Sequence, residues 1–514
     1  MKKLFKPIYL SVFIIGIIVF SCSKEVVQTN TVAPYSPSDL DVNAGKWKTY
    51  ILSAPTDITV AAPLSLSDAR YLNQVDSVKK AINNLTPADR ATIDYWGAGT
   101  VYRWNEIARE LAARYNLAPP ANADGTYPVP DANNPLVVPK FPFANPPYTA
   151  RALAYLSVAQ YDAMVSAYYY KFLYNRKPIY KYDNSVPPQL PASDLPSYPS
   201  EAGVIAGASY TVLAAMFPGE IPYLQSKLAE CKNARILAAM NISSENDAGE
   251  SLGRSVAAKV MARAKTDEMG AANNQTLVPG LKDAASARGM KELWVSQETP
   301  LRPPMLPNYG SVATWNFSKT DLANIRPAIP YIVGSAEFNK DLEELRNIKE
   351  NQTREQARIA NFWSDGAGSY TPPGHWHRFA CEAALEKKYS EVRMARTLAL
   401  VGTSLMDAGI ACWEAKYYYF APRPQQFGIS TSVGLPNFPS YASGHSTFSA
   451  AAADVLSYIF PEKASTFNDY AKEASNSRIY GLIHYRVDCE MGLVHGKKIG
   501  DFAIARGKAD GSGL

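Results

Sequence analysis

The chain has 514 residues, of which 47% are hydrophobic and 19% are charged. These proportions are typical of a globular protein with a large core, and the length exceeds what one core usually organises. The formal net charge is only +5, from 52 basic and 47 acidic residues. Because this balance is mild and no basic run with interleaved aromatic residues occurs, nucleic acid is excluded as an expected partner.

The N-terminus predicts an export signal. Positive charge at Met1-Lys2-Lys3 precedes an apolar run over residues 8–20, and Ser21-Cys22 follow. This pattern resembles a bacterial lipoprotein signal peptide of residues 1–21, with Cys22 as the lipidated residue. An uncleaved anchor is less favoured, because the apolar run is shorter than the roughly 20 residues that a spanning helix needs.

Residues 22–45 are rich in Ser, Thr, Pro, Asn and Val, and this composition predicts a flexible tether. We therefore expect a protein of the cell envelope, periplasmic or surface-exposed, that is membrane-tethered through its N-terminal lipid.

Helical segments separated by proline-rich loops are predicted for the rest of the chain. Thr86-Pro87 with Asp89 is typical of a helix start, whereas the prolines in 118–147 and 178–199 indicate ordered loops. Alternating strand patterns are scarce, so the pattern predicts an all-α protein. We expect an N-terminal helical region at 46–335 and a C-terminal helical bundle at 336–510. The expected helices are 150–169, 202–217, 246–265, 336–348, 353–364, 376–387, 390–415, 446–460 and 466–483.

Three segments near the C-terminus gather side chains that suit a tetrahedral oxyanion. Arginine offers a planar fork of donors to two oxygens, and lysine supplies a point charge. A serine hydroxyl can donate, and a glycine lets a backbone amide approach the anion. A histidine and an aspartate four residues apart would share a helix face, so that the carboxylate fixes the imidazole tautomer. The residues are Lys416, Arg423, Ser443, Gly444, His445, Arg478, His484 and Asp488.

In this order and spacing the three segments resemble the signature of the type 2 phosphatidic acid phosphatase and vanadium haloperoxidase superfamily. The matching patterns are Lys-x6-Arg-Pro, Ser-Gly-His and Ser-Arg-x5-His-x3-Asp. The resemblance implies an all-α fold of two helical bundles, of the vanadium haloperoxidase and acid phosphatase type, with long Pro-rich loops. It also implies a homodimer by analogy.

The same resemblance implies residue roles. His484 would be the nucleophile or the vanadium ligand, and His445 would be the general acid or base. Asp488 and Lys416 would complete the catalytic set. The anion-binding residues would be Lys416, Arg423, Ser443, Gly444, Arg478 and His484.

Two chemistries share such a pocket, because vanadate and phosphate have the same shape and charge. With vanadate as cofactor, the protein would be a haloperoxidase that oxidises a halide with hydrogen peroxide. Without a cofactor, it would be an acid phosphatase that hydrolyses a phosphomonoester through a phosphohistidine. An apolar halide or substrate pocket formed by Trp413, Phe438 and His375 would favour the first, although bundle packing explains the two aromatic residues equally well. A lipoprotein that binds an oxyanion without turnover is the third interpretation.

Overall fold

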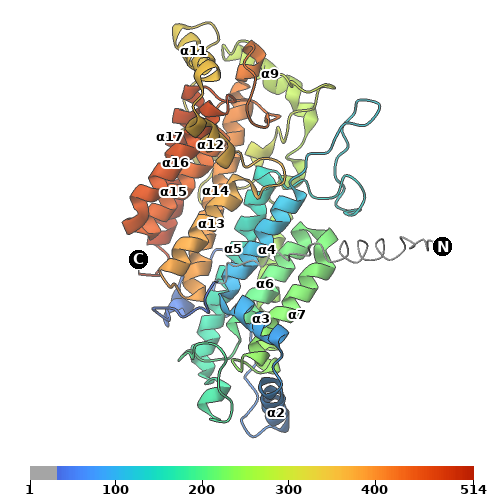
Figure 1. Ribbon diagram of the computed structural model, residues 1–514, viewed down its shortest axis with the longest axis vertical. Helices are drawn as coiled ribbons and strands as arrows, with labels where there is room; N and C mark the ends of the chain where they lie inside the picture. Colours follow the sequence, from blue (N-terminus) through green and yellow to red (C-terminus); the bar gives the residue numbers. More distant parts are fainter. Residues whose placement is uncertain (1–31, 514) are drawn as a thin grey trace, which may run out of the picture. The chain divides into compact units, whose positions relative to one another are not determined.

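The computed structural model describes residues 32–513, and regular structure within that range is helical, without a β-strand. The predicted all-α class is therefore confirmed (Figure 1). The α-helices are α2 (Ala69–Asn83), α3 (Pro87–Gly97), α4 (Thr100–Tyr115), α5 (Pro146–Tyr174), α6 (Glu201–Met216), α7 (Ile221–Leu237), α8 (Ser243–Ala264), α9 (Val278–Ala287), α10 (Lys319–Ile325), α11 (Ala336–Asn351), α12 (Arg354–Phe362), α13 (Thr371–Glu386), α14 (Glu391–Tyr419), α15 (Gly444–Ile459), α16 (Ala464–Tyr480) and α17 (Arg486–Lys508).

The local signals for helix starts and loops correspond to the observed structure. Thr86 caps α3, because its hydroxyl accepts the Asp89 backbone N–H at 3.2 Å while the Asp89 carboxylate accepts the Thr86 N–H at 2.9 Å. Residues 116–145, between α4 and α5, form a long proline-rich loop without an α-helix.

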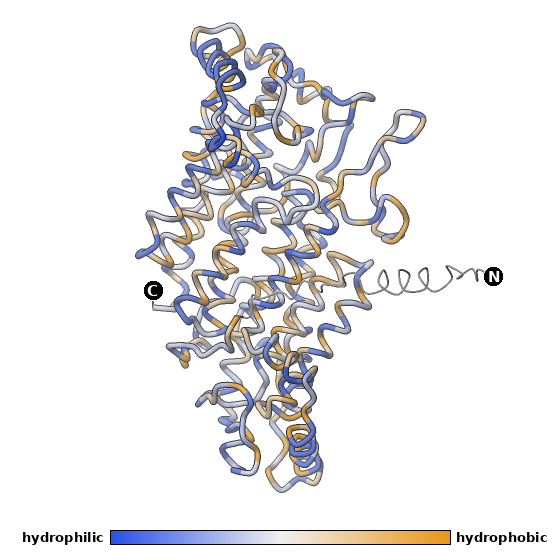
Figure 2. Tube along the Cα trace, in the orientation of Figure 1, coloured by the Kyte–Doolittle hydropathy of each residue, from blue (hydrophilic) through white to orange (hydrophobic). Residues whose placement is uncertain are grey.

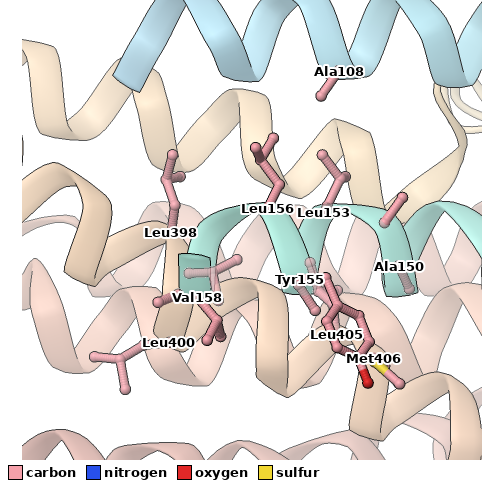
Figure 3. Close-up of a cluster of buried hydrophobic side chains, with 14 of the residues drawn as sticks. Ala108, Ala150, Leu153, Tyr155, Leu156, Val158, Leu398, Leu400, Leu405 and Met406 are labelled. Atoms are coloured by element: carbon pink, nitrogen blue, oxygen red, sulfur yellow. The ribbon is translucent and has the colours of Figure 1, made fainter. Parts of the chain in front are cut away.

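The structure contains two helical bundles, and the long helices α5 and α14 pack against each other where the bundles meet. Helices α5 to α8 pack on one another in the first bundle, and α14 to α17 form the second. Leu153 and Leu156 of α5 point toward α4, which carries Ala108, and Leu398 and Leu405 belong to the neighbouring helix α14 (Figure 3). In Figure 2, hydrophobic and hydrophilic positions interleave along the helices. One continuous hydrophobic core therefore crosses residue 335, and the domain division there stays a prediction.

Helix α17 is not among the expected helices, although a helical turn was expected at His484 and Asp488, and its glycines disfavour a helix in isolation. In the structure three of them, four residues apart, lie against α15. A Cβ added at Gly496 would lie 2.3 Å from the Thr447 carbonyl oxygen, and one at Gly492 would lie 2.9 Å from the Ser443 carbonyl oxygen. Tertiary packing thus overrides helix propensity, and the glycines let α15 and α17 approach closely.

The flexible tether predicted for residues 22–45 does not extend to residue 45. The Tyr35 N–H donates to the Gly97 carbonyl at 2.7 Å, Asp41 pairs with Arg393, and Ala44 is fully buried. Residues 35–45 thus belong to the helical body. Cys22 and the signal peptide lie outside the described residues. Within residues 32–513, no helix combines the length and apolar character needed to cross a membrane.

Candidate oxyanion site

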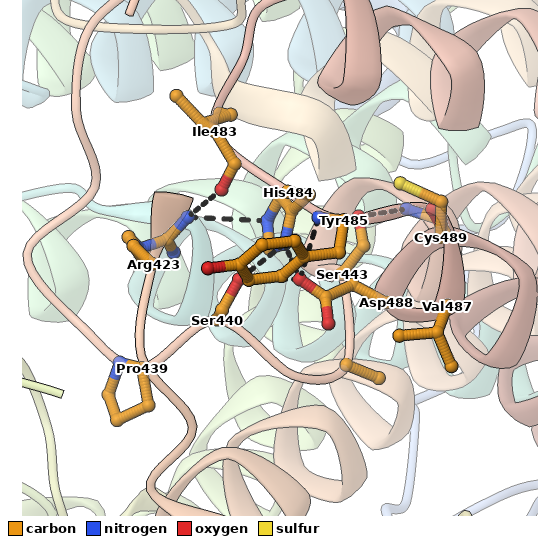
Figure 4. Close-up of polar contacts among 12 residues, drawn as sticks. Arg423, Pro439, Ser440, Ser443, Ile483, His484, Tyr485, Val487, Asp488 and Cys489 are labelled. Atoms are coloured by element: carbon orange, nitrogen blue, oxygen red, sulfur yellow. Dashed lines mark hydrogen bonds and ion pairs between the residues drawn. The ribbon is translucent and has the colours of Figure 1, made fainter. Parts of the chain in front are cut away.

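The three predicted segments meet at one end of the C-terminal bundle. Their side chains come from the C-terminal ends of α14 and α16, the N-terminal ends of α15 and α17, and the loops between them (Figure 4). The residues brought together are Lys416, Arg423, Ser443, Gly444, His445, Arg478, His484 and Asp488.

His484 and Asp488 form a buried pair, but not on one helix as predicted. His484 lies in the loop before α17, and Asp488 lies in the first turn of that helix. The His484 Nδ1 is 2.9 Å from an Asp488 carboxylate oxygen, which also accepts the Tyr485 N–H at 3.2 Å and the Ser440 hydroxyl. Ser440 was not predicted as part of the site. The carboxylate therefore fixes the ring by holding its Nδ1 proton.

The His484 imidazole is held neutral. Burial lowers its pKa well below the usual value, and the cations Arg423, Lys416 and Arg478 lower it further. Burial raises the pKa of Asp488 to about 6, so its carboxyl is ionised at neutral pH. With a proton on Nδ1, the Nε2 atom carries a lone pair, and its neighbour is the Arg423 Nη1 at 3.5 Å. The His484 Nε2 can therefore serve as a nucleophile or as a ligand.

Two arginines supply buried positive charge. Arg423 donates from Nε to the Phe438 carbonyl at 2.8 Å and from Nη1 to the Ile483 carbonyl at 2.7 Å. Arg478 donates from Nη2 to the Ala360 carbonyl at 3.2 Å. Burial lowers the pKa of each guanidinium to about 10, so both are cationic at neutral pH.

Lys416 is placed differently from the prediction. Its ammonium donates to the carbonyls of Pro439, Ser440 and Ala442 at 3.0, 2.7 and 2.6 Å, and it does not line the cavity. All three ammonium donors are therefore used by the backbone. Burial lowers the pKa of Lys416 to about 8. Lys416 thus holds the loop before α15 in place by hydrogen bonds to its backbone. Its positive charge lies next to the site without being part of the cavity wall.

His445 faces a carboxylate that the sequence analysis did not select. The His445 Nε2 lies 3.9 Å from Asp365 Oδ2, and the His375 Nδ1 lies 3.2 Å from Asp365 Oδ1. His375 was predicted to line the pocket, but it lies behind Asp365 and stacks on Trp363 at 4.7 Å between ring centroids. Burial and the Arg478 charge lower the pKa of His445 well below its usual value.

A cavity of about 550 Å³ opens onto these groups. His484, Arg478, His445 and Gly444 line it at the bundle end. Trp413 and Phe438 also line it, with ring centroids 4.8 Å apart. The two predicted aromatic residues therefore do form an apolar wall beside the cationic groups.

The donor set fits a tetrahedral oxyanion such as vanadate or phosphate. Arg423 Nη2 and His445 Nε2 are buried without a hydrogen-bond partner in the protein, whereas buried polar atoms are normally paired. The N-terminus of α15 adds backbone amides, which favour anions. A Cβ at Gly444 would meet only Trp413, at 3.8 Å, so protein packing does not require this glycine. The Ser443 hydroxyl caps α15 by accepting the Ser446 N–H at 3.4 Å.

The pKa of Lys416 predicts a pH dependence of anion binding. Sulfate is a suitable probe, because its charge is constant near neutral pH. Lys416 is cationic below about pH 8 and loses its charge above it, and a bound anion raises this pKa. Sulfate affinity should therefore fall as pH rises from 8 to 9, by at most about tenfold. Calorimetric titration measures this, and Lys416→Met should bind weakly with no such dependence. An equal pH dependence in that variant would contradict the assignment.

Comparisons with known proteins give one sequence match and several fold likenesses. Residues 397–502 match the sequence profile of the PAP2 superfamily. A bacterial vanadium-dependent iodoperoxidase has a similar fold, with a TM-score of 0.55, 20% identity, and coverage of 82% of this chain and 97% of its own. A bacterial vanadium-dependent chloroperoxidase in its holo form gives a TM-score of 0.49 and 14% identity, over 75% of this chain and 97% of its own. Curated protein sequences gave no match.

The profile match contains the three motif segments and the helices α15 and α16 between them. The fold likeness extends over the N-terminal bundle as well. Residues 397–502 are therefore similar to the PAP2 superfamily, and the all-α fold of the chain is similar to that of the bacterial vanadium-dependent iodoperoxidase.

Proposed function

We propose that the protein is a vanadium-dependent haloperoxidase, which oxidises a halide with hydrogen peroxide. The observation that carries the proposal is the neutral His484, whose Nε2 lone pair faces the Arg423 Nη1 at 3.5 Å among buried cations, beside the Trp413–Phe438 wall. An apolar wall suits a weakly hydrated halide better than a hydrated ester. The fold likeness to a bacterial vanadium-dependent iodoperoxidase supports the same choice.

In this proposal His484 would hold vanadate through Nε2, and the guanidinium groups of Arg423 and Arg478 would balance its charge. Bound vanadate supplies the activation of hydrogen peroxide for a two-electron oxidation. His445 Nε2 accepts a proton from the incoming peroxide and returns a proton to the product water. In total, one peroxide, one halide ion and one proton give one hypohalous acid and one water.

The protonation state of His445 bears on the alternative, an acid phosphatase. A phosphatase needs an imidazolium to protonate the leaving alcohol. Burial and Arg478 hold the pKa of His445 low, so the ring is neutral at neutral pH. A neutral His445 can accept a proton at Nε2 but cannot donate one from that atom to an alcohol. Phosphatase activity would require His445 to be protonated, which its lowered pKa disfavours in the anion-free site.

The decisive experiment compares both activities on one preparation. Apoprotein is incubated with orthovanadate, freed of unbound vanadate and assayed for peroxide-dependent oxidation of iodide and bromide. A chromogenic phosphate monoester is assayed in parallel without vanadate. Retained vanadium with halide oxidation supports the proposal. Strong ester hydrolysis without halide oxidation would replace it by the phosphatase, and neither activity would indicate an anion-binding protein.

His445→Ala should slow turnover more than it weakens anion binding. The ring lines the cavity beside Asp365, whereas the cations remain in the variant. We expect halide oxidation to fall about a hundredfold, which is typical for the loss of an acid or base. Vanadate retention, measured by elemental analysis, should change by only a few fold. An equal loss of both quantities would contradict a proton-transfer role.

The lipid anchor on Cys22, the envelope location and the homodimer are also proposals. Their support is the sequence pattern at residues 1–22 and the analogy with the superfamily. Metabolic labelling with a fatty acid tests the anchor, and a Cys22→Ser variant should lose the label. Light scattering on the purified body measures the oligomeric state.

A further inference from the structure

A second, smaller cavity lies in the N-terminal bundle. It is enclosed by the last turns of α5 and α7, the first turn of α6 and the loop between α5 and α6. Pro146, at the start of α5, lines the large cavity of the oxyanion site, whereas Lys171, near the end of the same helix, lines the second one. The intervening length of helix corresponds to roughly 37 Å. The two cavities share no lining residue and are separate sites.

Two cationic side chains line this cavity with unused hydrogen-bond donors. Lys171 is only 2% exposed, and its ammonium donates to the Pro196 carbonyl at 2.5 Å. Its other two N–H groups find no acceptor in the part of the chain that the structure describes. Arg235 donates from Nε to Asn241 Oδ1 at 3.1 Å, and its terminal nitrogens have no acceptor among residues 32–513. Because buried donors are normally paired, these groups indicate a ligand that accepts hydrogen bonds.

The neighbouring carboxylates do not satisfy these donors. Glu245 accepts from three other groups, at 2.6 to 3.3 Å. Glu201 accepts the Tyr168 hydroxyl at 3.1 Å, and its second oxygen stays 3.9 Å from the Lys171 Nζ. Burial lowers the pKa of Lys171, and the charges of Glu201 and Glu245 offset this effect only in part. An anion in contact with the ammonium would therefore stabilise its charged form.

The size of the cavity restricts the ligand. Its volume is about 30 Å³. One water needs roughly 10–15 Å³ of such volume, so the cavity has room for a single-atom anion but not for sulfate or an organic acid. A halide ion accepts several hydrogen bonds at once and carries the charge that a buried ammonium lacks, whereas a water molecule supplies only the hydrogen bonds.

We propose that this cavity binds one chloride or bromide ion, held by the ammonium of Lys171 and the guanidinium of Arg235. Because Lys171 also bonds to the Pro196 carbonyl, the ion stabilises the loop between α5 and α6 on the end of the bundle. The ion at this site is not a substrate. The inference is therefore independent of the proposed function.

Bromide gives the direct test, because its anomalous X-ray scattering locates it. Crystals of the protein grown without halide and soaked in sodium bromide should show an anomalous peak at hydrogen-bonding distance from the Lys171 Nζ. Ordered water alone in this cavity, without an anomalous peak, would overturn the inference. A peak in the large cavity does not bear on this outcome, because the two positions are distinguished in the same map.

Thermal unfolding measures the binding in solution, since a ligand of the native state raises the Tm. We expect a higher Tm in sodium bromide than in sodium gluconate at equal ionic strength. Lys171→Met should weaken the bromide affinity derived from this effect by about tenfold or more. Glu201→Gln should strengthen it by a few fold, because it removes a negative charge from the cavity and retains an acceptor for Tyr168. Lys181→Met is the matched control, because Lys181 pairs with Asp194 at 2.9 Å on the same loop and does not line the cavity.

The comparison between variants separates this cavity from any halide bound at the oxyanion site, which all of them retain. If Lys171→Met fails to fold, Arg235→Gln provides the same comparison and should also weaken bromide binding. A bromide effect of equal size in the wild type and the folded cation variant would overturn the inference. A crystallographic peak without any bromide effect on the Tm would also overturn it, as binding at crystal concentration only. Halide oxidation is measured separately, so failure of the proposed function leaves this test unchanged.

Discussion

Replacing His484 by alanine should abolish halide oxidation, with a loss of at least about a thousandfold, as expected when a covalent ligand or nucleophile is removed. The variant should also lose vanadate on gel filtration, because it lacks the Nε2 atom that lies 3.5 Å from Arg423 and that would hold the vanadate in the proposed function. Any phosphatase activity should disappear as well. Peroxide-dependent iodide oxidation and vanadium analysis measure the two effects.

His495→Ala is the matched control for this variant. His495 is a second buried histidine, 1% exposed, on α17, and its ring makes no hydrogen bond in the structure. Removing it tests the cost of losing a buried imidazole away from the anion site. Circular dichroism should show that both variants keep their helical content. Full activity in the folded His484→Ala variant would refute the assignment of this residue.

Asp488→Asn should have the second largest effect. The carboxylate accepts from the His484 Nδ1 and from the Tyr485 N–H. An amide of the same shape can place its N–H₂ against Nδ1, which would drive the ring proton to Nε2 and remove the lone pair that faces the anion. We expect halide oxidation to fall about a thousandfold or more, in line with carboxylate-to-amide changes beside catalytic histidines.

The pH profile separates this effect from a general loss of stability. Burial raises the pKa of Asp488 to about 6, so the carboxylate is lost as pH falls through that value. Wild-type activity should decline below about pH 6. The activity of Asp488→Asn should be low at every pH and should show no such decline. Asp341→Asn is the control, because Asp341 accepts the Val487 N–H at 3.0 Å from the same helix start without contacting His484. If the activity of Asp488→Asn declined below about pH 6 as in the wild type, this would contradict the role of the Asp488 carboxylate in orienting His484.

Local sequence patterns predicted most of the helices and the composition of the site. Thr86 with Asp89 marked a helix start, and proline clusters marked the long loops, because caps and proline act within a few residues. The three motif segments were found for the same reason, since each is contiguous in sequence. The predicted site residues are brought together by the fold, apart from His375, which lies behind Asp365.

The features that sequence reasoning missed depend on tertiary contacts. Asp365 lies 80 residues before His445, and its sequence position gives no sign that it faces this histidine. Ser440 joins the site only because its loop folds onto Asp488. The donors of Lys416 point to backbone carbonyls instead of the cavity, and spacing alone cannot indicate this orientation.

The glycines of α17 have a consequence for catalysis. Helix α17 begins beside His484, and the first turn of α15 holds His445. The two helices pack closely because the glycines of α17 have no side chain, and Gly492 lies against the Ser443 backbone. Close contact of the two helices at these glycines therefore sets the distance between the His484 imidazole and the first amides of α15, the groups that would bind the anion in the proposed function. A single methyl group added at one of these glycines would push the two helices apart. It would therefore disturb the site, although it lies a full helical turn or more from any reacting atom.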